Sequence, residues 1–152
     1  MADHPQVRFP PPLAFLGFVL LGFLAHRLFG LARDDLGLWH YVAIPLALAG
    51  IWLVGAALLG FRRVGENPEP WTGTATVVEE GPYRVTRNPM YLGMLLLCLA
   101  VAAWFGSLPV AIGAIVAAAI IDRTVIRAEE HYLSRTLGER YEAYRRRVRR
   151  WL

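Results

Sequence analysis

The stretch Leu38–Phe61, LWHYVAIPLALAGIWLVGAALLGF, decides the fold class, because none of its 24 residues is an acid, a lysine or an arginine. A helix needs about 20 mostly apolar residues to cross the hydrocarbon core of a bilayer. Three further apolar stretches lie at 13–31, 89–105 and 108–126. Backbone polar groups in lipid must be hydrogen-bonded within the chain, so each stretch is expected to be a helix. The sequence therefore predicts an all-α, polytopic membrane protein with about four transmembrane helices.

The composition agrees with this prediction. Of 152 residues, 56% are hydrophobic and 18% are charged, which is too apolar for an ordinary soluble domain of this length. We expect a single membrane domain over 1–152. The segment Met1–Gln6 carries no basic residue and the apolar stretch after it is long, so we expect a retained first helix rather than a cleaved signal.

Two segments outside the apolar stretches are not expected to cross the membrane. Residues 62–88 are rich in proline and glycine and are predicted to form a structured loop. Residues 127–150 are predicted to form one amphipathic helix, with Glu142 and Arg146 placed for an ion pair. Its apolar face would carry residues at helical spacing, namely Leu133, Leu137, Tyr141, Tyr144 and Val148.

The arginines predict the orientation. All sixteen basic residues are arginine, and nine of them lie in the last thirty residues. Basic residues near helix ends favour the cytoplasmic side, so the 62–88 loop and both termini are predicted to be cytoplasmic. A basic segment after apolar helices indicates membrane lipids as partners rather than nucleic acid, because its aromatic residues fall on the apolar face.

The densest cluster of functional groups is GPYRVTRNPMYLG at 81–93. Gly81 and Pro82 form a turn signal, Asn88 is a good helix N-cap, and Pro89 suits the first helical position. Two arginines and two tyrosines therefore crowd the start of the 89–105 helix. Interfacial tyrosine and arginine also anchor membrane helices, so a purely structural role stays open.

A second cluster follows the 108–126 stretch and consists of Asp122, Arg123, Arg127, Glu129 and Glu130. Charges beside a membrane helix are costly unless they are paired or functional. Only Gly106 and Ser107 separate the 89–105 and 108–126 stretches, so these are expected to form an antiparallel hairpin. The two clusters should then emerge at the same membrane face, although a solvated salt-bridged surface is the alternative.

The metal-binding classes find no support. The single cysteine, Cys98, excludes an intramolecular disulfide and a multi-cysteine site, and no two histidines have metal-ligand spacing. We predict no metal site.

The two clusters carry a family resemblance. The GPY turn, the R-N-P-x-Y helix start, the Glu pair and the G-E-x-Y-x-x-Y tail occur in order between about Arg62 and Leu152. This order resembles the C-terminal half of the isoprenylcysteine carboxyl methyltransferase and phospholipid methyltransferase families, which are integral-membrane enzymes that use S-adenosylmethionine. Asn88 stands where many members have histidine, which removes an imidazole base from that position.

The resemblance implies which residues hold S-adenosylmethionine, namely those around Val78, Gly81, Tyr83, the stretch from Asn88 through Pro89 to Tyr91, and Glu129. From the residues themselves, Arg87 could bind the carboxylate of this cofactor by paired hydrogen bonds. Glu129 or Glu130 could bind its ammonium group, and Tyr83 or Tyr91 could face its sulfonium.

The acceptor would be lipophilic and enter from the bilayer: an isoprenylcysteine carboxylate, a phospholipid amine or a small isoprenoid. Direct methyl displacement depends mainly on positioning. A carboxylate needs no base, whereas an amine or alcohol would need a proton acceptor, for which Glu130 is the candidate. Arg123 or Arg127 could hold an acidic headgroup or carboxylate.

Two other functions stay open. One is a membrane reductase related to the sterol reductases and using NADPH, although 152 residues is short for that class. The other is a non-catalytic membrane scaffold or lipid-binding protein. The sequence contains no G-x-G-x-x-G motif of a dinucleotide-binding domain, and it leaves the oligomeric state open.

Overall fold

The computed structural model describes residues 10–29, 37–69 and 76–152. Within these ranges the chain is helical and has no β-strand, which confirms the predicted all-α fold. The α-helices are α1 (Pro11–Phe29), α2 (Gly37–Arg63), α3 (Pro89–Trp104), α4 (Leu108–Ile121), α5 (Arg127–Leu137) and α6 (Glu139–Arg147). A 3₁₀ turn, η1 (Gly81–Arg84), precedes α3, and a π-helical turn, η2 (Asp122–Ile126), joins α4 to α5.

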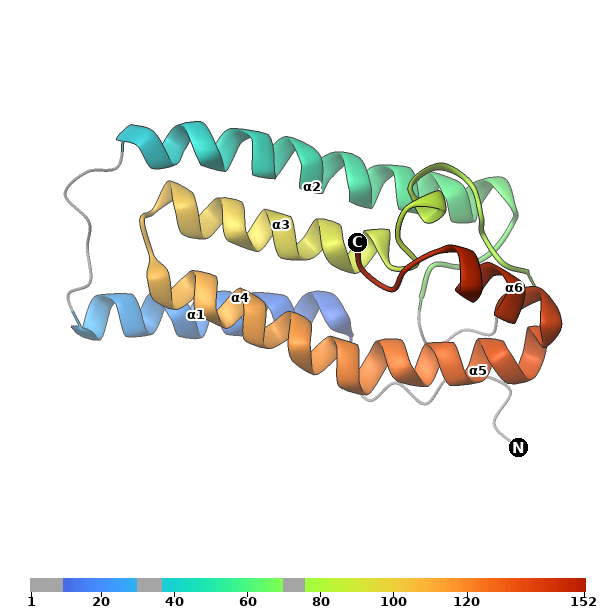
Figure 1. Cartoon of the computed structure of the whole chain (residues 1–152). Helices are drawn as coiled ribbons and strands as arrows, with labels where there is room; N and C mark the ends of the chain where they lie inside the picture. Colours follow the sequence, from blue (N-terminus) through green and yellow to red (C-terminus); the bar gives the residue numbers. More distant parts are fainter. Residues whose placement is uncertain (1–9, 30–36, 70–75) are drawn as a thin grey trace.

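The four long apolar helices lie side by side, with α1 packed on α4 and α2 packed on α3 (Figure 1). Glycines permit both contacts. A Cβ atom on Gly93 would lie 2.9 Å from the carbonyl oxygen of Gly50, and one on Gly113 would lie 2.7 Å from the carbonyl oxygen of Phe18. Small residues that let backbones approach closely are typical of helix packing in membranes.

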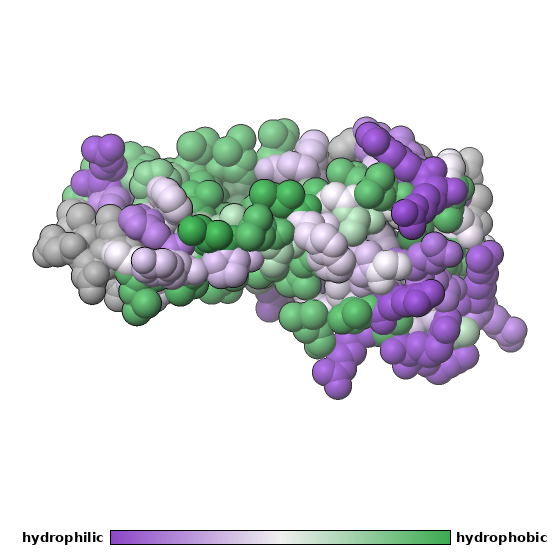
Figure 2. Space-filling model, turned by 90° about the horizontal axis from the view of Figure 1, so that it is seen from above, coloured by the Kyte–Doolittle hydropathy of each residue, from purple (hydrophilic) through white to green (hydrophobic). Residues whose placement is uncertain are grey.

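The middle of the bundle presents an apolar surface, and hydrophilic side chains gather over the end that carries α5 and α6 (Figures 1 and 2). The helices α1, α2 and the continuous run Leu108–Leu137 are long and apolar enough to cross a membrane, and α3 is a shorter apolar helix. Large side chains such as Leu20, Leu48 and Ile112 are exposed on them. An apolar surface of this extent is suited to lipid rather than water, so the chain is a membrane protein.

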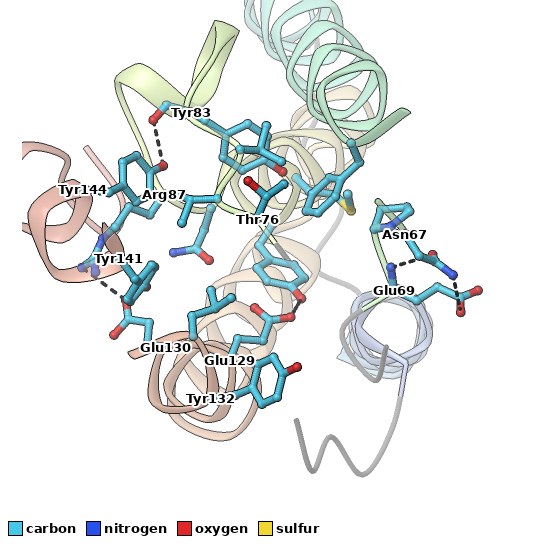
Figure 3. Close-up of a pocket in the computed structure, with 18 residues that line it drawn as sticks. Asn67, Glu69, Thr76, Tyr83, Arg87, Glu129, Glu130, Tyr132, Tyr141 and Tyr144 are labelled. Atoms are coloured by element: carbon cyan, nitrogen blue, oxygen red, sulfur yellow. Dashed lines mark hydrogen bonds and ion pairs between the residues drawn. The ribbon is translucent and has the colours of Figure 1, made fainter. Parts of the chain in front are cut away.

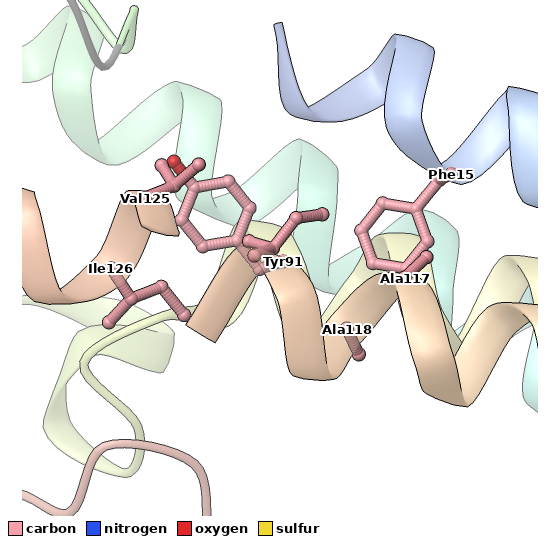
Figure 4. Close-up of a cluster of buried hydrophobic side chains, with 7 residues drawn as sticks. Phe15, Tyr91, Ala117, Ala118, Val125 and Ile126 are labelled. Atoms are coloured by element: carbon pink, nitrogen blue, oxygen red, sulfur yellow. The ribbon is translucent and has the colours of Figure 1, made fainter. Parts of the chain in front are cut away.

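A tight turn makes α3 and α4 an antiparallel hairpin, as predicted. Gly106 has φ +58°, a conformation that glycine adopts without strain, and the hydroxyl of Ser107 accepts a hydrogen bond from the backbone N–H of Val110 at 3.4 Å. The hairpin brings the start of α3 beside the end of α4. Buried side chains of α1, α3, α4 and η2 meet there, among them Phe15, Tyr91, Ala117 and Ile126 (Figure 4).

The helix ends differ slightly from the predicted bounds. The first helix begins at Pro11 rather than at 13, and its predicted residues 30–31 lie outside the described ranges. The second runs from Gly37 to Arg63, the third ends at Trp104, and the predicted 108–126 helix appears as α4 plus η2. Residues 70–75 of the predicted 62–88 loop are also outside the described part.

The prediction of one helix over 127–150 is wrong. Gly138, with φ +52° and ψ −129°, ends α5 and reverses the chain into α6, and from Val148 the backbone is extended. The predicted apolar face still packs together, because α6 folds back beside α5 and both cover Val77. Glu142 pairs with Arg145 at 3.5 Å and accepts a hydrogen bond from Ser134 at 2.7 Å, instead of pairing with Arg146.

Candidate functional site

A cavity of about 120 Å³ lies at the polar end of the bundle (Figure 3). Its walls come from the end of α2, the 76–91 segment, α5 and α6, which are far apart in the sequence. The hairpin and the reversal at Gly138 bring these segments together. Seven of the predicted site residues line it, namely Val78, Tyr83, Arg87, Asn88, Tyr91, Glu129 and Glu130.

Four predicted site residues do not line this cavity. Gly81 has φ +58° and forms the turn into η1, and Pro89 is buried at the first position of α3. Arg123 and Arg127 lie on the other side of the α4–α5 helix, where they line a separate groove. The first two therefore shape the site without touching the cavity, and the two arginines belong to a different surface.

Glu129 places a carboxylate in the cavity wall. Its Oε1 accepts a hydrogen bond of 2.7 Å from the hydroxyl of Tyr91 across the α3–α5 contact. Among the described residues, no cationic side chain lies within ion-pair distance of Glu129. A partly buried carboxylate without a cation favours a positively charged ligand group beside it.

Glu130, in contrast, is buried and doubly paired. One guanidinium nitrogen of Arg87 lies 3.2 Å from its Oε1, and Arg150 donates to Oε1 at 3.0 Å and to Oε2 at 2.6 Å. Both carboxylate oxygens are thus occupied by guanidinium donors. Arg150 also reaches both oxygens of Asp122 at 3.4 Å, so it links α5 to the end of α4.

Arg87 is satisfied on one side only. Its side chain is 9% exposed, and its Nε and Nη1 atoms are buried and make no hydrogen bond with any residue in the described ranges. Unpaired buried donors of a charged group cost free energy, so they favour an anionic partner. The cavity therefore offers both a donor group for an anion and a carboxylate for a cation.

Tyrosines make up much of the remaining wall. The ring of Tyr83 meets Phe61 edge to face at 5.8 Å, and the hydroxyl of Tyr144 donates to the carbonyl oxygen of Tyr83 at 2.8 Å (Figure 3). Burial raises the pKa of the Tyr83 and Tyr144 hydroxyls, and it raises the pKa of Tyr141 to about 12. These phenols therefore stay protonated at neutral pH and act as neutral donors.

The extended segment after α6 is hydrogen-bonded to the residues that precede α3. The N–H of Arg87 donates to the carbonyl oxygen of Arg149 at 2.9 Å. The carbonyl oxygen of Arg150 accepts from the Thr86 hydroxyl at 3.1 Å and from Nδ2 of Asn88 at 2.9 Å. Asn88 stands at the N-cap of α3 and Pro89 at the first helical position, as predicted. The Asn88 side chain, however, is tied to the segment after α6 and makes no capping hydrogen bond to α3.

Sequence reasoning did not assign several residues of the wall. Tyr141 and Tyr144 belong to the tail motif that carried the family resemblance, so their spacing was a usable signal. Leu133 belonged to the predicted apolar face, and Met90 lies within the predicted cofactor stretch from Asn88 to Tyr91. The others carried no signal of their own, namely Phe61, Asn67, Pro68, Glu69, Thr76, Val77 and Tyr132.

Comparisons with known proteins show the family of the chain. The sequence model of the phospholipid methyltransferase family (PEMT) matches residues 38–140. An uncharacterized protein of Haemophilus influenzae is 40% identical to the chain over 63 residues, which cover 41% of the chain and the whole length of that relative. No solved structure matches the chain. The family match spans α2 to the start of α6 and includes the residues that line the cavity except Tyr141 and Tyr144.

Proposed function

Because the chain belongs to the phospholipid methyltransferase family, we propose that it is a membrane-embedded enzyme that transfers a methyl group from S-adenosylmethionine to a lipophilic acceptor. The observation that supports this most is that one cavity contains both unpaired cationic donors and a carboxylate without a cationic partner. Arg87 has two unpaired buried donors, and Glu129 has no cationic partner among the described residues. A zwitterionic amino acid end meets both needs.

The residues of the cavity fit the proposed methyl donor. When bound, S-adenosylmethionine supplies an electrophilic methyl carbon on a positively charged sulfur. Arg87 would donate a charge-assisted hydrogen bond to its carboxylate from one of the two unpaired donors, either Nε or Nη1. Glu129 would bind its ammonium group, with the Tyr91 hydroxyl fixing the orientation of the carboxylate. The rings of Tyr83 and Tyr91 would face the sulfonium.

We assign Glu130 a positioning role in place of the predicted role as proton acceptor. Both of its oxygens are held by guanidinium groups of Arg87 and Arg150, so neither is free to take a proton from an acceptor. Its contact with Arg87 instead holds that side chain against the cavity. The remaining contribution of the protein is alignment of the acceptor with the methyl carbon, which can supply much of the rate in a direct displacement.

The acceptor would reach the site from the bilayer, because the helices that border the cavity expose apolar side chains to lipid. Candidates remain an isoprenylcysteine carboxylate, a phospholipid amine and a small isoprenoid. The concentration of arginines around α5, α6 and the end of α2 supports a cytoplasmic position for this end of the bundle.

Calorimetry of the detergent-purified protein with S-adenosylmethionine and with NADPH tests the proposal. We expect binding of S-adenosylmethionine only. Glu129→Gln and Arg87→Gln should each weaken it by about tenfold to a hundredfold, as expected for loss of one charged hydrogen-bond partner. The exposed residues Glu139 and Arg84 provide matched controls, since Glu139→Gln and Arg84→Gln make the same charge changes outside the cavity.

Three results would overturn the proposal. Binding of NADPH alone would assign the chain to the reductases, and binding of neither compound would favour a scaffold. Unchanged S-adenosylmethionine affinity in both Glu129→Gln and Arg87→Gln would remove the proposed binding mode. A methylation assay of lipid extract with labelled cofactor would then identify the acceptor.

A further inference from the structure

A second hollow, which we call the basic groove, is open to the outside of the bundle, has a volume of about 620 Å³ and lies beside the α3–α4 hairpin and the C-terminal segment. Its apolar half is formed by Leu95 of α3 and by Ile115, Ala118 and Ala119 of α4, and its basic half is formed by arginines around η2. The side chain of Ile115 is 58% exposed. This half carries apolar side chains only, so it can lie against a hydrocarbon chain.

The basic half has more positive charge than its neighbours neutralise. It contains four arginines, of which Arg87 and Arg150 are paired with the buried Glu130. Arg123 makes a hydrogen bond of 3.4 Å to the carbonyl oxygen of Ala119, and no described acid lies within ion-pair distance of it.

Arg127 is held only weakly. It lies 4.0 Å from Asp122, with its side chain 61% exposed, and Asp122 is shared with Arg150. The guanidinium groups of Arg123 and Arg127 therefore line the groove with little negative charge beside them. Such a pair matches a phosphate, because arginine binds phosphate oxygens through directed, charge-assisted hydrogen bonds.

The position of these arginines fits the membrane surface. The 19 residues from Leu108 to Ile126 rise about 28 Å, close to the thickness of the hydrocarbon core. Arg127 therefore lies at headgroup depth, and the long side chain of Arg123, one turn earlier, can extend to that depth, while Ile115 lies among the acyl chains. The indole of Trp151, which also lines the groove and donates to Asp122 at 3.0 Å, is a typical residue of this interface.

We propose that the basic groove binds a membrane phospholipid with an anionic headgroup, its phosphate between Arg123 and Arg127 and one acyl chain along α3 and α4. The site is distinct from the cavity assigned to the methyl donor, and its existence does not depend on the methyltransferase proposal. Arg87 lines both cavities, so a lipid in the groove lies directly beside that cavity.

Native mass spectrometry of the full chain in detergent tests the lipid site. Equal amounts of phosphatidylglycerol or phosphatidylcholine are added, and retained lipid is counted without any cofactor. The wild-type protein should retain phosphatidylglycerol in preference by about tenfold or more, as two arginines near an anionic headgroup would give. The double variant Arg123→Gln/Arg127→Gln should lose this preference, and Arg123→Lys/Arg127→Lys should retain part of it.

The matched control is Arg62→Gln/Arg63→Gln, which removes two exposed arginines at the same end of the bundle but away from the groove. It should keep the wild-type preference, and an equal loss in this variant would reduce the effect to general charge attraction. Displacement of the lipid by inorganic phosphate alone would also overturn the proposal, as would a wild-type protein that shows no preference or that dimerises through the groove without lipid. Unchanged S-adenosylmethionine binding in Arg123→Gln/Arg127→Gln would show that a lost lipid preference does not arise from unfolding or from failure of the methyl-donor cavity.

Discussion

Removal of the Arg150 side chain should distinguish the effect of its hydrogen bonds within the site from the effect of losing one positive charge at the surface. It donates two hydrogen bonds to Glu130, at 3.0 and 2.6 Å, and two longer ones to Asp122. Arg150→Gln removes these contacts and leaves the buried Glu130 with Arg87 alone. The backbone of residue 150, which holds Thr86 and Asn88, is retained.

The expected cost follows from these contacts. Hydrogen bonds to charged groups contribute about 1.5–3 kcal/mol, and the Arg150 side chain is 28% exposed, which reduces its share through solvent screening. Because Arg87 still compensates Glu130, we expect a loss of about 2 kcal/mol rather than the larger cost of an unpaired buried charge. For a chain of this length, that corresponds to a fall of roughly 4–8 °C in Tm.

The assay is thermal unfolding in detergent, followed with and without S-adenosylmethionine. Arg149→Gln is the matched control, since it makes the same charge change one residue away on an exposed side chain. We expect Arg150→Gln to lower Tm and to reduce the stabilisation by S-adenosylmethionine, because the Glu130 oxygen that Arg150 held is then free to draw Arg87 away from the ligand. Equal Tm values for the two variants would refute the reasoning, as would full ligand stabilisation in Arg150→Gln.

Three further predictions concern packing, the chain reversal and alkaline pH. Gly93→Leu should destabilise the fold by about 1–3 kcal/mol through overpacking, because its Cβ would lie 2.7 Å from a side chain of α2. The yield of folded protein in size-exclusion chromatography should therefore fall. Gly55→Leu has open space at the Cβ and should leave the yield unchanged. Gly138→Ala should destabilise the reversal by about 1–3 kcal/mol, because φ is +52° there, and limited proteolysis should cut between α5 and α6 sooner than in the wild type; an unaltered cleavage rate would contradict this. Burial raises the pKa of Tyr141 from 10.0 to about 12, so its contribution to stability is complete below pH 10 and is lost as the pH rises toward 12; Tm scans should fall over that range, and by less in Tyr141→Phe.

The membrane-embedded part of the fold could be predicted because lipid imposes simple rules. Apolar length alone located the helices that became α1 to α4 within a few residues, and the two-residue turn at Gly106 and Ser107 implied the hairpin. The hairpin in turn implied that the start of α3 and the acids of α5 meet, which the hydrogen bond between Tyr91 and Glu129 confirms.

The polar end was harder to predict, because its structure depends on contacts between distant residues. Periodicity over 127–150 gave the correct apolar face but could not show that Gly138 reverses the chain. Asparagine is a residue type that often caps helices, yet the side-chain amide of Asn88 donates to the carbonyl oxygen of Arg150, 62 residues away. The double pairing of Glu130 was equally hidden, since Arg150 reaches it only after α6 has folded back.

The π-helical turn η2 limits which deletions the sequence of this protein can tolerate. Such a turn holds one residue more than an α-helical turn, so it shifts everything after it by about 100° around the axis. The lipid-facing residues of α4 and the acidic residues of α5 therefore lie on different faces of one continuous helix. Loss of a single residue between Asp122 and Ile126 would leave the apolar helix α4 intact but would rotate Glu129 and Glu130 away from their present partners. This short segment therefore sets the orientation of the two carboxylates relative to the membrane span.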